Sequence, residues 1–84
     1  MREPGWPHGN RPRATLLWEV WKTGRIMSCE VNEHPLGWEI RCYVSGDFHY
    51  IHVHPVRFEA ETEADEKKRE LLALGWTDRP PMPD

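Results

Sequence analysis

Apolar and polar side chains alternate along most of the chain before residue 55. A period of two is typical of strands that bury one face. The alternation predicts four strands, at residues 14–22, 26–31, 38–44 and 48–54. Segments rich in turn-forming residues separate these strands at 23–25, 32–37 and 45–47. Because all three connections are short, we expect an antiparallel meander in which each strand pairs with the one before it.

The same alternation divides the strand residues between two faces. The face predicted to point inward carries Leu16, Trp18, Val20, Met27, Cys29, Val31, Trp38, Ile40, Cys42, Val44, Ile51 and Val53. The face predicted to point outward carries Leu17, Glu19, Trp21, Arg41, Tyr43, Tyr50, His52 and His54.

A helix is predicted after the last strand. Thr62 is a favourable N-cap, and Asp65 stands where the partner residue of a capping box belongs. Gly75 fits the left-handed position that follows a helix end, and Trp76 is then placed to pack on Leu71. The predicted buried stripe consists of Ala64, Leu71, Leu72 and Leu74, with the Lys68 stem lying across it. The expected fold class is α+β, a ββββα arrangement with the helix on one sheet face.

Residues 14–76 are predicted to form a single domain. The flanking segments 1–13 and 77–84 are rich in proline and glycine, which predicts disordered arms. The sequence has neither a signal-like segment nor a long apolar run, so we expect a cytoplasmic protein without membrane contact.

Several turn and packing motifs are similar to those of short uncharacterised bacterial proteins of unknown function. They are Thr23-Gly24-Arg25, Cys29-Glu30, Gly37-Trp38-Glu39, Gly46-Asp47-Phe48 and Gly75-Trp76. The resemblance covers about residues 16–76. It implies a bacterial origin and carries no activity.

The formal net charge of −3 is unevenly distributed and argues against a simple nucleic-acid binder. Residues 1–57 hold seven Lys/Arg and six Asp/Glu, whereas residues 58–84 hold four and eight. Tyrosine, tryptophan and arginine, which are enriched at the centres of protein interfaces, occur on the outward face. We therefore expect a protein-binding surface, with a second copy of the chain as one partner. Its residues would be Trp21, Arg41, Tyr43 and Tyr50, with His52 and His54 at the rim.

Two alternative functions involve other kinds of partner. Single-stranded nucleic acid can stack on an open aromatic sheet face, although this face has few cations for phosphate contacts. The acidic helix could instead imitate a nucleic-acid backbone and inhibit an enzyme, but Lys67, Lys68 and Arg69 interrupt its negative stripe.

Histidines in the run FHYIHVH raise the possibility of a metal site. On a strand, His52 and His54 point to the same side about 6.5–7 Å apart. A metal ion needs at least a third ligand, and Glu39 is a candidate on a neighbouring strand. Because no motif supplies a complete ligand set, we expect no cofactor.

The two cysteines have several possible roles. If residues 26–31 pair with 38–44, Cys29 and Cys42 lie opposite each other on the inward face. They could then form a disulfide or half of a zinc site, but two free buried cysteines are favoured, reduced in the cytoplasm. Since the chain lacks motifs for nucleophilic or phosphate chemistry, we expect a protein that is not an enzyme.

Overall fold

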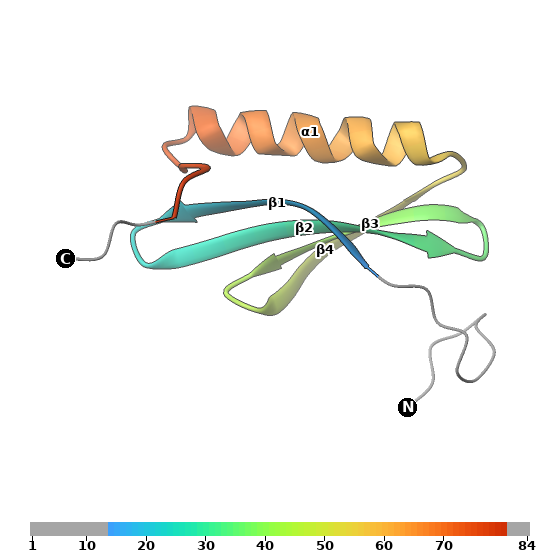
Figure 1. Cartoon of the computed structure of the whole chain (residues 1–84), viewed down its shortest axis with the longest axis horizontal. Coiled ribbons are helices and arrows are strands. Elements are labelled where there is room, and N and C mark those ends of the chain that lie inside the picture. The colour runs from blue at the N-terminus through green and yellow to red at the C-terminus, as the bar shows by residue number, and fades with distance from the viewer. Residues whose placement is uncertain (1–13, 81–84) are drawn as a thin grey trace.

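The computed structural model describes residues 14–80 and contains one antiparallel sheet followed by one helix (Figure 1). The strands follow one another in the order β1-β2-β3-β4, and the helix α1 covers one face of the sheet. This confirms the predicted fold class. The elements are β1 (Thr15–Lys22), β2 (Arg25–His34), β3 (Gly37–Val44), β4 (Asp47–His54) and α1 (Arg57–Ala73). The arm predicted at 1–13 and residues 81–84 of the predicted tail lie outside the described residues.

Two-residue turns connect β1 to β2 and β3 to β4. Both central residues of each turn have positive φ, at 49° and 76° for Thr23-Gly24 and 49° and 87° for Ser45-Gly46. Turns of this kind match the right-handed twist of the strands they join. The loop predicted at 32–37 is shorter than expected, since β2 continues to His34 and only Pro35-Leu36 remains between strands.

A bulge in β1 reverses the predicted faces of its first residues. Leu16 pairs with Glu30 and Trp18 pairs with Cys29, so Leu17 is an extra residue in the strand. Leu16 is consequently 57% exposed, whereas Leu17 packs against the core. Strict alternation cannot anticipate such a reversal, because a bulge shifts every preceding side chain to the other face.

The predicted faces of β4 are also wrong. Its residues Tyr50 and His52 pair with Cys42 and Ile40, which are fully buried beneath α1. Tyr50, His52 and, by alternation, His54 therefore lie on the helix-covered side, while Ile51 and Val53 lie on the open side. The prediction assumed that the aliphatic residues point inward. On this edge strand, polar contacts to α1 decide the orientation instead.

The helix begins earlier than predicted. Its N-cap is Val56, which makes no side-chain cap, and Thr62 lies inside the helix with its hydroxyl donating to the Phe58 carbonyl at 2.8 Å. The first turn of α1 therefore forms without a side-chain cap. Start signals in the sequence therefore pointed to the wrong residue.

Small side chains bring α1 close to the sheet. Ala60 and Ala64 are fully buried, and the indole nitrogen of Trp18 donates to the Ala64 carbonyl at 2.9 Å. The predicted leucine stripe is wrong for Leu72 and Leu74, which are 36% and 65% exposed. The spacing of 60, 64, 67 and 71 defines the face that α1 turns toward the sheet, and Leu71 packs against the core there.

The predicted helix end is confirmed. Gly75 has a φ of 100°, its amide donates to Leu72, and the Trp76 amide donates to Leu71, the two bonds of a Schellman motif. The chain then returns to the sheet, where Thr77 exchanges two backbone hydrogen bonds with Trp21 at 2.8 and 2.9 Å. This bridge ties the segment after α1 to the edge of β1.

The core lies between the sheet and α1. Its buried members are Trp18, Val20, Met27, Cys29, Val31, Ile40, Cys42, Ala60 and Ala64. Within residues 14–80, α1 does not combine the length and apolar character that crossing a membrane requires.

Candidate metal centre

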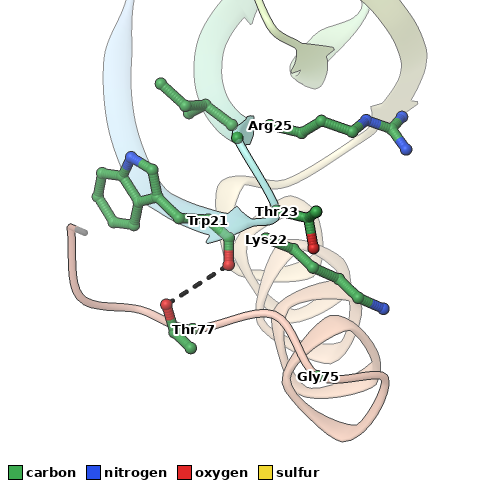
Figure 2. A pocket seen from close by; sticks show the side chains of 8 residues that line it. Trp21, Lys22, Thr23, Arg25, Gly75 and Thr77 are labelled. Carbon is green, nitrogen blue, oxygen red and sulfur yellow. Dashed lines mark hydrogen bonds between the residues drawn. The ribbon is translucent and has the colours of Figure 1, made fainter.

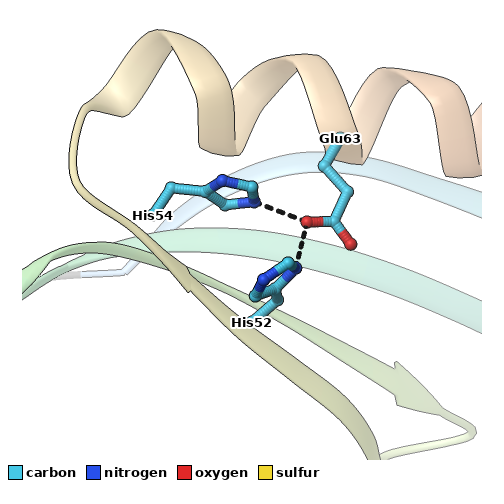
Figure 3. Close-up of side chains that lie close together, drawn as sticks. All are labelled: His52, His54 and Glu63. Atoms are coloured by element: carbon cyan, nitrogen blue, oxygen red, sulfur yellow. Dashed lines mark hydrogen bonds and ion pairs between the residues drawn. The ribbon is translucent and has the colours of Figure 1, made fainter.

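Three side chains of the types that ligate metals converge between β4 and α1 (Figure 3). His52 Nδ1 and His54 Nε2 each lie 2.5 Å from the same oxygen, Oε1 of Glu63. The ligand atoms of the three residues all lie within 4.8 Å of one another. Within residues 14–80, this is the one group of three or more such side chains.

The local structure explains this convergence. His52 and His54 are two residues apart on a strand and therefore project from the same face of β4. Their imidazole rings lie 4.4 Å apart between centroids. Glu63 precedes the buried Ala64, so its side chain descends from the flank of α1 toward β4, as Figure 3 shows. The three side chains therefore meet only because α1 packs on the sheet in a position that places Glu63 above β4.

Tyr50 completes the polar contacts of Glu63. Its hydroxyl donates to the second carboxylate oxygen, Oε2, and lies 3.3 Å from His52 Nδ1. Lys67 places its ammonium 3.9 Å from the centre of the Tyr50 ring. Both Glu63 oxygens therefore have partners on the sheet, and α1 is connected to β4 by charge-assisted hydrogen bonds.

The electrostatics of Glu63 favour its ionised form. Burial alone would raise the pKa of this carboxyl group, but the hydrogen bonds from Tyr50 and His54, together with the charge of His52, lower it overall. Burial, followed by the hydrogen bond to Glu63, raises the pKa of Tyr50 to about 12. Tyr50 is therefore a neutral hydrogen-bond donor to an ionised carboxylate at neutral pH.

Two imidazole nitrogens and one carboxylate oxygen fit the ligand preferences of Zn²⁺. Metal–ligand bonds of about 2.0–2.2 Å in a tetrahedral site hold ligand atoms roughly 3.4 Å apart. The 2.5 Å contacts to Glu63 must therefore lengthen by about 1 Å to admit an ion. The His52 side chain is 51% exposed and has room to move, whereas those of His54 and Glu63 are only 18% and 20% exposed.

Glu39, the third ligand considered from the sequence, does not lie beside His52 and His54. Glu39 pairs with Val53 on the opposite side of the sheet from His52, and its carboxylate accepts a 2.9 Å hydrogen bond from Arg41. Glu63 takes its place as the third side chain of the cluster. Sequence spacing gave no sign of Glu63, because its position depends on where α1 begins and how it packs.

The open sheet face retains three of the six residues predicted to bind a partner, Trp21, Arg41 and Tyr43. Tyr50, His52 and His54 lie on the helix-covered face instead. A second bulge, at His49, turns Phe48 toward the open side, where it pairs with Tyr43 at a ring separation of 6.3 Å. The most exposed apolar side chains of this face are Leu16 (57%), Ile26 (41%), Phe48 (58%) and Ile51 (42%).

Trp21 borders a hollow of about 630 Å³ at the end of the sheet (Figure 2). The β1–β2 turn forms one wall, and Gly75 and Thr77 form the other. The Lys22 ammonium donates to the Leu74 carbonyl at 2.7 Å, which satisfies an end of α1. The hollow is therefore shaped by the contacts that hold the helix C-terminus on β1.

Cys29 and Cys42 lie opposite each other, as expected from the pairing of β2 with β3. Both are fully buried, and neither is in a disulfide. This agrees with the predicted free buried cysteines.

Comparison of the chain with protein-family models, with curated proteins and with solved structures found no match.

Proposed function

We propose that the protein binds a divalent transition-metal ion, with Zn²⁺ as the best fit, through His52, His54 and Glu63. The observation that carries the proposal is the convergence of three donor atoms from two elements on one point. Such a set is typical of sites with three protein ligands and an open fourth position. The half-exposed His52 places that position toward solvent.

Metal binding at this point would join α1 to β4. A bound ion stabilises the folded chain because the unfolded chain does not hold the three ligands together. Metal ions bind deprotonated ligands, so affinity would fall in acid. The proposed function is therefore a metal-dependent strengthening of the contact between sheet and helix.

Isothermal titration of untagged protein with zinc chloride tests this function. We expect one ion per chain, with affinity reduced by more than about 100-fold in His54→Ala and Glu63→Gln, since outer partners of metal sites alone contribute about 10–100-fold. His49→Ala is the matched control, because His49 lies on β4 outside the cluster. Unchanged zinc affinity in Glu63→Gln, or equal loss in His49→Ala, would contradict the proposed site.

A second candidate function is self-association through the open sheet face. Phe48, Ile51 and Ile26 leave apolar surface exposed on a face that also presents Tyr43. Two sheets can bury such faces against each other at a separation of about 10 Å. Tyr50 no longer belongs to this face, and the Glu30 carboxylate, which accepts from Tyr43, disfavours phosphate contacts there. A second copy of the chain therefore fits it better than nucleic acid does.

Light scattering after size exclusion tests the second candidate. We expect a dimer that Ile51→Glu dissociates, whereas Glu66→Lys on the exposed side of α1 leaves it intact. A monomeric wild type at high protein concentration would contradict self-association and leave the metal proposal unaffected.

A further inference from the structure

Cys29 and Cys42 occupy a particular kind of antiparallel pair. Such pairs alternate between those that exchange two backbone hydrogen bonds and those that exchange none. The Ser45 amide donates to the Ile26 carbonyl at 2.6 Å, which makes positions 26 and 45 a hydrogen-bonded pair. By alternation, 28–43 is bonded and 29–42 is not. The two cysteines therefore occupy the pair type in which opposite side chains come closest, with Cα atoms about 4.5 Å apart.

This spacing suits a disulfide. The Cα atoms of disulfide-bonded cysteines are usually 4.4–6.8 Å apart, so closing a bond here needs only rotation of the two side chains. The register also fixes the partners, because Val31–Ile40 and Met27–Val44 pack on either side of the cysteine pair. The strands hold the two thiols together before any oxidation.

The environment makes the two thiols unequal. The hydrogen bond from Cys29 lowers the pKa of Cys42, although burial opposes this effect, and the positive charge of Lys67 also favours the Cys42 thiolate. The hydrogen bond to Cys42, together with burial, raises the pKa of Cys29. Cys42 is thus the thiol that loses its proton first, and Cys29 keeps its own.

Access to the pair is controlled by α1. Both cysteines are fully buried, and the face above them is closed by a helix whose buried contacts come from Ala60 and Ala64. Within residues 14–80, α1 is the element that covers this face, so the thiols become accessible when α1 opens locally. A small oxidant reaches the thiols through such openings more readily than a bulky one.

We propose that Cys29 and Cys42 are a redox pair that hydrogen peroxide converts into a reversible cross-strand disulfide. The Cys42 thiolate attacks one peroxide oxygen, the O–O bond breaks, and the departing hydroxide takes up a proton to become water. The resulting sulfenic acid at Cys42 is attacked by the Cys29 sulfur. The S–O bond breaks, the disulfide forms, and a second water leaves with the Cys29 proton. Two electrons pass from the thiols to the peroxide.

Peptide mapping after peroxide treatment tests the pair in the folded, full-length chain. Remaining thiols are blocked, and the protein is then digested with trypsin. Cleavage after Arg25, Arg41 and Arg57 separates the two cysteines into peptides 26–41 and 42–57. We expect these peptides to be linked to each other, at one link per chain, and to separate after treatment with dithiothreitol. Oxidation that yields only cross-links between chains, or links that form only in urea, would overturn the proposal.

Two single-cysteine variants test the assigned order. In Cys29→Ala, the Cys42 sulfenic acid cannot be resolved and should be trapped by dimedone. In Cys42→Ala, the remaining Cys29 should be trapped at least tenfold more slowly. If either variant fails to fold, the order is read in the wild type with limiting iodoacetamide, which should label Cys42 before Cys29. Faster labelling or trapping of Cys29 would overturn the assignment of Cys42 as the attacking thiol.

Discussion

At the residue scale, Glu63 is the centre of the contact between α1 and β4. One of its oxygens faces two imidazoles and the other accepts from Tyr50. Its ionisation is thereby coupled to folding, because the unfolded chain offers the carboxylate none of these partners. This coupling gives the contact a definite dependence on pH.

We expect Glu63 to make the protein more sensitive to acid. Its pKa in the folded chain lies below the ordinary value of 4.5, so its stabilising contribution is present above that value and lost as pH falls through the lower folded pKa. Urea unfolding followed across this acidic range should show a smaller loss of stability in Glu63→Gln than in the wild type. The exposed Glu66→Gln is the control and should behave as the wild type does. Parallel curves for all three proteins would contradict the coupling.

Gly37 provides a second prediction at this scale. A Cβ atom at this position would lie 2.2 Å from the carbonyl oxygen of His54, and the φ of 140° is unfavourable for other residues. We expect Gly37→Ala to lower the free energy of unfolding by at least about 2 kcal/mol, through backbone strain at the base of β4. Gly24→Ala is the control. It also has positive φ but open space around it, and should cost about 1 kcal/mol. Equal costs in urea unfolding would contradict the steric argument.

At the element scale, small side chains determine how α1 lies on the sheet. Ala60 and Ala64 allow the helix backbone to approach closely enough for the Trp18 indole to reach a helix carbonyl. Of the leucines near the helix end, Leu71 packs against the core, whereas Leu74 is 65% exposed. The position of α1 is thus set mainly by how closely its backbone approaches the sheet at these two alanines, and less by large apolar side chains.

We expect enlargement at this contact to be costly. Ala64→Leu should lower the free energy of unfolding by about 1–3 kcal/mol, because the added atoms force α1 away from Trp18. Leu74→Ala should change it by less than about 0.5 kcal/mol, since Leu74 is 65% exposed. Chemical denaturation followed by tryptophan fluorescence measures both. A larger effect for Leu74→Ala would instead support the leucine stripe predicted from the sequence.

These elements differ in how far the sequence predicts them. Both glycine-containing turns and the Gly75 helix end were predicted, because only a few residue types adopt positive φ. The start of α1 was not, since Val56 carries no capping side chain. The orientation of β4 was not predicted either, because both of its faces carry side chains that can be buried. Glu63 therefore could not be connected to His52 and His54 before the packing was known.

At the scale of the whole molecule, α1 lies over two potential sites at once. Its flank supplies Glu63 to the proposed metal site, and its buried face covers Cys29 and Cys42. Any ligand that holds α1 on the sheet therefore also restricts access to the thiols.

We accordingly expect zinc to protect the cysteines. At 100 times its dissociation constant, an ion bound only to the closed form stabilises that form by about 2.7 kcal/mol, which corresponds to about 100-fold fewer openings. Peroxide oxidation of the pair should slow by up to that factor. In Glu63→Gln, zinc should have no effect at the same concentration. Equal oxidation rates of the wild type with and without zinc would contradict the connection between the two sites.

The order of the elements along the chain has a further consequence. Proteins are synthesised from the N-terminus, and all four strands precede α1 in the sequence. Because each strand pairs with its immediate neighbour through a two-residue turn, the meander needs only local contacts to assemble. A newly made chain can therefore bring Cys29 and Cys42 together before the helix that covers them exists. Newly synthesised molecules would therefore be the most readily oxidised, until α1 docks on the sheet and covers the thiols.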